Sequence, residues 1–63
     1  MNNIRPIRKE KGITQRQIAN ELGTSVQYIS DLERDRRTAT QGTWEKIAEF
    51  LSVSVADLRG KPA

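Results

Sequence analysis

The side chains that most often carry out catalysis are absent from this sequence. It has no histidine and no cysteine, so no imidazole base, no thiolate nucleophile and none of the usual zinc ligands of that kind is available. Its acidic residues are scattered at helix-surface spacing, and it has no glycine-rich loop of the kind that holds a phosphate group. We therefore expect no enzymatic activity, no catalytic residue, no metal site and no cofactor.

One stretch of side chains suits a different chemistry, the recognition of base pairs. In residues 26–34 the apolar Ile29 and Leu32 fall on one side of a helix and leave a mostly polar side free. An α-helix fits the major groove of B-DNA, where all base pairs differ in their pattern of donors and acceptors. The candidate base-reading residues are Val26, Gln27, Ser30 and Asp31.

Each of these side chains has a chemical and a structural interpretation. Gln27 can bond to N6 and N7 of adenine, the methyl groups of Val26 suit the thymine methyl group, and Ser30 can reach a base edge. Asp31 can accept a hydrogen bond from N4 of cytosine. In the alternative interpretation, Gln27 favours a helix, Val26 is a secondary core residue, Asp31 pairs with Arg34, and Ser30 contacts nothing. The residues alone leave these alternatives open.

Apolar spacing predicts that short helices position these residues. Trp44, Ile47, Ala48 and Leu51, for example, follow the i, i+3, i+4, i+7 pattern of a buried helix face. Only two valines alternate in the manner of a strand, so we expect an all-α fold. The expected helices are about 3–11, 15–22, 26–34, 41–51 and 55–59.

The junction between the second and third expected helices has a sharp sequence signature. Thr14 and Gln17 form a capping box that begins one helix, Gly23 can end it in a left-handed conformation, and Ser25 can cap the next. A turn of about three residues forces the two helices to cross steeply, which requires a small residue at the crossing. Ala19 meets this requirement.

Composition limits the size and class of the protein. The chain has 63 residues, of which 35% are apolar and 30% charged, so we expect one domain over residues 1–63 with a small core. Eleven basic residues against eight acidic ones give a net charge of +3, which suits a polyanionic partner but could also serve solubility alone. No apolar run exceeds two residues, so we expect no membrane segment and a cytoplasmic location.

The apolar, small and glycine positions together follow one recurrent pattern. They are Gly12-Ile13-Thr14-Gln15, Ile18-Ala19, Leu22-Gly23-Thr24-Ser25, Ile29-Ser30 and Leu32-Glu33, continued by Lys46-Ile47-Ala48 and Val53-Ser54-Val55. Through these residues the chain resembles the phage-repressor (Cro/cI-type) helix-turn-helix family over about residues 4–58. The resemblance implies a compact, five-helix, lambda-repressor-like domain with its helix-turn-helix unit at about 15–34, followed by a tail or linker start at 60–63.

The resemblance also implies roles for residues beside the third helix. Gln27 and Asp31 match base-reading positions of the family. Gln15 matches a glutamine that contacts phosphate and braces the recognition helix, although it could simply belong to a helix start. Arg8 and Glu33 match a partly buried arginine–carboxylate pair, which we interpret as structural rather than as two unrelated surface charges.

Contacts to DNA phosphates are expected on both sides of the third helix. Helix N-termini offer free amide groups to phosphate, and a cluster of arginines adds positive charge, although such a cluster is often only a solvated surface. The ring of Tyr28 could instead have a half-buried packing role. The expected phosphate-contacting residues are Gln15, Tyr28, Arg34, Arg36, Arg37, Thr40 and Gln41.

Some residues depart from the family pattern. Asp35 and Ser52 stand where the family commonly has glycine, and aspartate adopts the left-handed conformation less readily, so the loop path near Arg36 is an open question. Phe50 is bulkier than usual at its position, and we expect it in the core rather than in contact with a second subunit.

The resemblance and the residues together predict a regulator of transcription. We expect a sequence-specific protein that binds double-stranded DNA, most simply a repressor that acts as a homodimer on a palindromic operator, with the dimer formed either in advance or only on DNA. Val53, Val55 and Leu58 could belong to the core or to a dimer interface. The alternative is an antitoxin or adaptor that uses the same fold to hold a partner protein.

Overall fold

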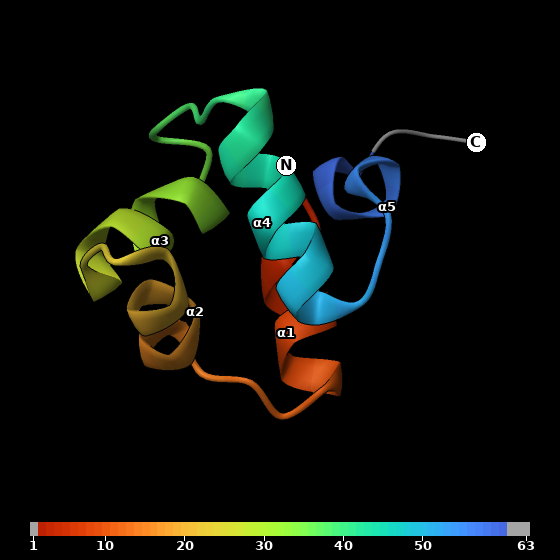
Figure 1. Cartoon of the computed structure of the whole chain (residues 1–63), viewed down its shortest axis with the longest axis horizontal. Helices are drawn as coiled ribbons and strands as arrows, with labels where there is room; N and C mark the ends of the chain where they lie inside the picture. Colours follow the sequence, from red (N-terminus) through yellow and green to blue (C-terminus); the bar gives the residue numbers. More distant parts are fainter. Residues whose placement is uncertain (1, 61–63) are drawn as a thin grey trace.

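Over residues 2–60, which the computed structural model describes, the chain forms helices connected by short turns (Figure 1). No strand occurs in this part of the chain, so the prediction of an all-α helix-turn-helix fold is confirmed. None of these helices has both the length and the apolar character needed to cross a bilayer. The helices are α1 (Ile4–Glu10), α2 (Gln15–Leu22), α3 (Val26–Glu33), α4 (Gln41–Leu51) and α5 (Val55–Arg59).

Two helix ends are shorter than expected. The sequence extends the first helix to Lys11 and the third to Arg34, but the structure makes each of these residues a C-cap. The backbone amide of Arg34 still bonds to the carbonyl of Ser30 at 3.2 Å. Its φ and ψ of −93° and 5° have already left the helical range, because the next residue, Asp35, is left-handed with a φ of 59°.

Side-chain caps fix the junction between α2 and α3. The Thr14 hydroxyl accepts a hydrogen bond from the Gln17 amide at 3.1 Å, and the Gln17 side chain accepts one from the Thr14 amide at 2.7 Å. Gly23 ends α2 with a φ of 69°, and the Ser25 hydroxyl accepts from the Tyr28 amide at 3.1 Å. The predicted capping box and glycine terminus are therefore present, and they set the path from α2 into α3.

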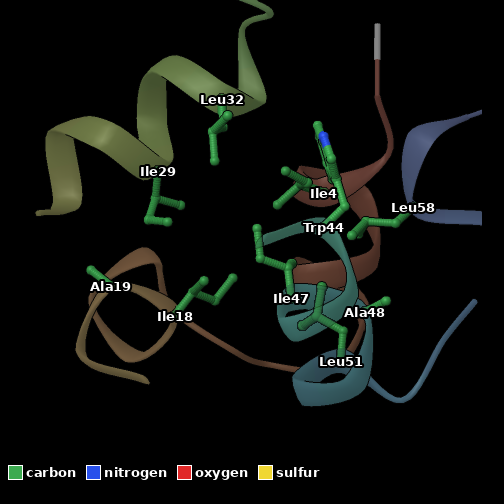
Figure 2. Close-up of a cluster of buried hydrophobic side chains, with 10 residues drawn as sticks. All are labelled: Ile4, Ile18, Ala19, Ile29, Leu32, Trp44, Ile47, Ala48, Leu51 and Leu58. Carbon is green, nitrogen blue, oxygen red and sulfur yellow. The ribbon is translucent and has the colours of Figure 1, made fainter. Parts of the chain in front are cut away.

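The core lies where α2 and α3 meet α4, α1 and α5 (Figure 2). Ala19 is 2% exposed at the contact between α2 and α3, where a larger side chain would hold the two helices apart. Figure 2 shows Ile29 and Leu32 pointing from α3 into this cluster. The buried apolar residues are Ile4, Ile18, Ala19, Ile29, Leu32, Trp44, Ile47, Ala48, Leu51 and Leu58.

The residues that the sequence could assign either to the core or to a dimer interface pack inward. Leu58 is fully buried, and Val53 and Val55 are half-buried against the core. Phe50 is also half-buried against the core, as expected, and keeps part of its ring at the surface. Burying a side chain such as Leu58 stabilises a domain by about 1.5–3 kcal/mol, so α5 is a structural part of this fold.

Asp35 and Ser52 adopt the left-handed conformation that the family pattern assigns to glycine. Their φ values are 59° and 60°, so both residues take a backbone conformation that costs glycine less. Asp35 can adopt this conformation because aspartate, like asparagine, is one of the few residues besides glycine that do so. Its carboxylate accepts a hydrogen bond from Nδ2 of Asn2 at 3.0 Å.

Candidate nucleic-acid interface

Helix α3 exposes one of its sides to solvent. Figure 1 shows α3 at one edge of the molecule, beside α2. Gln27 is exposed, whereas Ser30 and Asp31 are half-buried. Val26 is half-buried as well and packs against the core, which matches its structural interpretation and leaves only part of the side chain for a base. The solvent-facing side of α3 therefore presents an exposed Gln27 with two half-buried polar side chains beside it.

Gln27 and Asp31 are joined by a hydrogen bond across one turn of α3. Nε2 of Gln27 donates to Oδ1 of Asp31 at 3.0 Å. The expected alternative partner of Asp31 was Arg34, but no ion pair joins these two residues in the described part of the chain. The carboxylate accepts from the residue four positions before it instead, a spacing that brings helical side chains together.

A buried network connects the end of α3 to α1 and α2. Nε of Arg8 donates to Oε2 of Glu33 at 2.8 Å, and the two side chains are 12% and 5% exposed. Arg8 also donates to the Ile13 carbonyl at 3.1 Å. Nε2 of Gln15 donates to Oε1 of Glu33 at 3.1 Å, which connects the start of α2 to the end of α3.

The basic loop after α3 is partly ordered by an aromatic contact. Arg34, Arg36 and Arg37 are all exposed. The guanidinium carbon of Arg37 lies 5.2 Å from the centroid of the Tyr28 ring, within the range of a cation–π interaction. Tyr28 is half-buried against the core, as its packing interpretation expects, so it gives Arg37 a fixed support.

The start of α4 carries the remaining expected phosphate contacts. The Thr40 hydroxyl accepts a hydrogen bond from the Thr43 amide at 3.2 Å and so acts as the N-cap. Gln41 is exposed, and its Nε2 lies 3.4 Å from Oε2 of Glu45 as a long hydrogen bond. Both residues are accessible, and their contact with phosphate stays a prediction.

The sequence did not predict the contacts that two residues near the N-terminus make with the region around α3. Asn2 donates through Nδ2 to the Leu32 carbonyl at 2.6 Å, which ties this segment to the end of α3. Arg5 lines a groove of about 440 Å³ between α1, α2 and α3. No periodic signal could have found either residue, since their neighbours in space lie far along the chain. Among residues 2–60, no group of acidic side chains is arranged to hold a metal ion.

Comparisons with known proteins extend across nearly the whole chain. A family model described as helix-turn-helix matches residues 4–58. An HTH-type transcriptional regulator of Sinorhizobium fredii is 42% identical over 57 residues, which cover 90% of this chain and 74% of the relative. The immunity repressor protein of Bacillus phage phi105 is 38% identical over 58 residues, which cover 92% of this chain but only 40% of the repressor. An HTH-type transcriptional regulator of Bacillus subtilis is 36% identical over 55 residues, or 87% of this chain and 80% of the relative.

Proposed function

Because the chain belongs to the Cro/cI-type helix-turn-helix family of DNA-binding transcriptional regulators, we propose that it reads a specific DNA sequence with α3 in the major groove. The observation that carries the proposal is the two-sided character of α3. Ile29 and Leu32 are fully buried, while Gln27 on the opposite side is exposed and donates one hydrogen bond across a turn of the helix. A helix anchored in this way can enter the groove without disturbing the core.

Gln27 is the residue that we propose to read adenine. A side-chain amide recognises adenine by donating to N7 and accepting from the N6 amino group. One Nε2 hydrogen of Gln27 goes to Asp31. The second hydrogen and the amide oxygen remain free, which is the pair of groups that adenine requires. Asp31 therefore acts as a positioning residue for Gln27, and Ser30 and Val26 would contact neighbouring bases.

The affinity would come mainly from phosphate contacts around α3. Arg37 is held over the Tyr28 ring, so less conformational entropy is lost when its guanidinium meets the backbone. Arg34 and Arg36 supply further charge, and Gln15, Thr40 and Gln41 lie at the starts of α2 and α4, where free amides suit phosphate. We expect these groups to set the register of α3 on the duplex.

The size of α3 favours action as a dimer. Its 8 residues span about 12 Å at 1.5 Å per residue, so one copy reads only a few base pairs. Two copies on a palindromic operator would double that number, with half-sites about 10–10.5 base pairs apart from centre to centre. Repression is the simplest outcome, since a bound dimer blocks access to a promoter, and one relative carries the name of an immunity repressor.

Selection of bound sites from a random duplex pool tests this proposal. We expect enriched sites with two inverted half-sites at that spacing and at least one conserved adenine in each half. A pool without enrichment would overturn the proposal and favour the alternative of a protein-binding adaptor. Enriched sites without inverted symmetry would leave sequence-specific binding in place and refute the dimer.

A Gln27→Ala variant tests the proposed base reader. It should lose about 1–3 kcal/mol of discrimination at one adenine and keep the preference at other positions. Asn20→Ala removes an exposed carboxamide from α2 and serves as the matched control, with no change in site preference expected. Circular dichroism of both variants checks that the helices are intact. An unchanged preference in Gln27→Ala would refute the assignment.

A further inference from the structure

The groove between α1 and α3 lies beside the proposed DNA interface, and we propose that it binds one phosphodiester group of the DNA backbone through Arg5. This inference rests on the proposed function and adds a residue of α1 to the contacts. The groove has a volume of about 440 Å³, and its lining includes Arg5, Arg8, Gln15, Ser30, Glu33 and Arg34. The arginine side chains in this lining can bind a phosphate group, either in the DNA backbone or free in solution.

The charges that line the groove are unbalanced. Arg8 is neutralised by Glu33 at 2.8 Å, and among residues 2–60 Glu33 is the only acidic residue in the lining. Arg5 and Arg34 are exposed, and no acidic side chain of residues 2–60 pairs with either of them. The groove therefore holds two guanidinium groups without a counterion from the described part of the chain.

The groove is continuous with the base-reading side of α3. Ser30 and Arg34 follow Gln27 by three and seven positions, a spacing that places all three along one side of a helix. Both Ser30 and Arg34 also line the groove, with Arg5 on its α1 wall. A duplex whose major groove receives Gln27 thus brings one backbone strand toward this wall.

Two guanidinium groups without a counterion from residues 2–60 suit a phosphate group of the DNA backbone. Guanidinium groups bind phosphate oxygens through paired N–H donors, and a phosphodiester offers oxygens to two arginines at once. The Ser30 hydroxyl is half-buried in the lining and adds a neutral donor. The groove is open to solvent on a face that already contacts DNA in the proposed function, so a backbone phosphate reaches it without any movement of the helices.

The first test compares Arg5→Gln with Lys46→Gln in binding to the selected duplex. Lys46 is exposed on α4 and lines a separate groove with Glu21, Glu49 and Phe50, so its replacement removes the same charge elsewhere. Each phosphate contact contributes a slope of about 0.9 to the dependence of log K on log salt, or about 3.5-fold in affinity between 50 and 200 mM. We expect the salt slope of Arg5→Gln to be smaller than that of the wild type by about 0.9. The slope of Lys46→Gln should equal that of the wild type.

Folding is controlled within the same set of variants. Arg5 makes no side-chain hydrogen bond in the described part of the chain, so thermal unfolding of Arg5→Gln should match that of the wild type. Arg5→Lys keeps the charge and loses the paired donors, and it should restore the salt slope while binding more weakly than wild type. A slope in Arg5→Lys equal to that of Arg5→Gln would overturn a role for the charge of Arg5.

Replacement of single backbone phosphates by neutral methylphosphonates identifies the partner of the groove. At one position per half-site, the methylphosphonate should weaken DNA binding by the wild-type protein about as much as Arg5→Gln weakens binding to unmodified DNA. The same methylphosphonate should not weaken binding by Arg5→Gln any further. If, at every position, the loss from the methylphosphonate adds to the loss from Arg5→Gln, the assignment is overturned. Inorganic phosphate is the probe for the other source: saturation of the wild type at sub-millimolar phosphate, with loss in Arg5→Gln, would identify a free anion and overturn the backbone contact.

The failures of the two proposals are distinguishable. If the wild type shows no site preference, both are overturned. If the wild type keeps its preference and Arg5→Gln behaves like Lys46→Gln, only the groove is refuted, and the contacts proposed for α3 stand.

Discussion

Replacing Arg8 with alanine should destabilise the domain more than any change at the outer side of α3. The substitution removes the 2.8 Å ion pair with Glu33 and the 3.1 Å hydrogen bond to the Ile13 carbonyl. It leaves the Glu33 carboxylate, whose residue is 6% exposed, with Gln15 as its remaining side-chain donor. A buried charge that loses its ionic partner is the costly part of this change.

The expected loss is about 3–5 kcal/mol, which is typical for breaking one side of a buried pair. A chain of 63 residues at roughly 0.05–0.15 kcal/mol per residue has a total stability of only about 3–9 kcal/mol. The loss therefore removes at least about a third of the total stability and, at the lower end of that range, all of it. Because Glu33 also holds Gln15, the start of α2 should lose its contact with α3 at the same time.

Urea denaturation followed by circular dichroism measures this loss. A double variant, Arg8→Met with Glu33→Leu, removes both charges and fills similar volume. Its loss in free energy of unfolding should therefore be much smaller than the sum of the losses in the single variants Arg8→Met and Glu33→Leu. Arg16→Ala removes an exposed charge from α2 and should stay within about 0.5 kcal/mol of the wild type.

A loss below about 1 kcal/mol in Arg8→Ala, the range of exposed ion pairs, would refute the cost expected for a buried pair. A double variant that loses the full sum of Arg8→Met and Glu33→Leu would refute it equally, since the pair would then contribute no coupling energy.

Three further predictions concern other parts of the structure. Asp31→Ala removes the hydrogen-bond acceptor of the Gln27 amide and should lower discrimination at the adenine read by Gln27 by about 1 kcal/mol, measured by competition between matched duplexes. If Asp31→Ala causes the same loss in a Gln27→Ala background, Asp31 does not act through Gln27. Tyr28→Leu should weaken binding evenly across sequences by removing the support of Arg37, a contact of about 0.5–1 kcal/mol, whereas Tyr28→Phe should not; a loss with Phe would point to the hydroxyl instead. Ser52→Gly should stabilise the domain by about 0.5–1 kcal/mol in urea denaturation, because Ser52 has a φ of 60°, and a lower stability would show that its side chain makes a needed contact.

The helices were predictable because their signals are local. The Thr14 capping box, the left-handed Gly23 and the apolar spacing in α4 each involve residues within one or two turns of one another. Their energies depend little on the rest of the chain, so the sequence predicts all five ranges to within about one residue at each end. The ends at Lys11 and Arg34 were missed because a residue can keep its helical hydrogen bond after its dihedrals have changed.

The candidate site was only partly predictable. Helical periodicity predicts that Ile29 is buried and that Gln27 is exposed, and the structure agrees. The partner of Asp31 could not be predicted, since Gln27 and Arg34 both lie within reach on the helix and rotamers decide between them. The support of Arg37 by Tyr28 depends on the path of the loop after α3.

The amino-acid sequence by itself determined the helices to within about one residue at each end, the apolar faces and the family, since these depend on residues close together along the chain. Only the tertiary structure decided which distant side chains meet. The contact of Asn2 with Leu32 spans 30 positions, and the contact of Gln15 with Glu33 spans 18. No periodicity encodes such pairs, because they arise only when separate helices pack on a common core. The groove that joins Arg5 to α3 exists for the same reason.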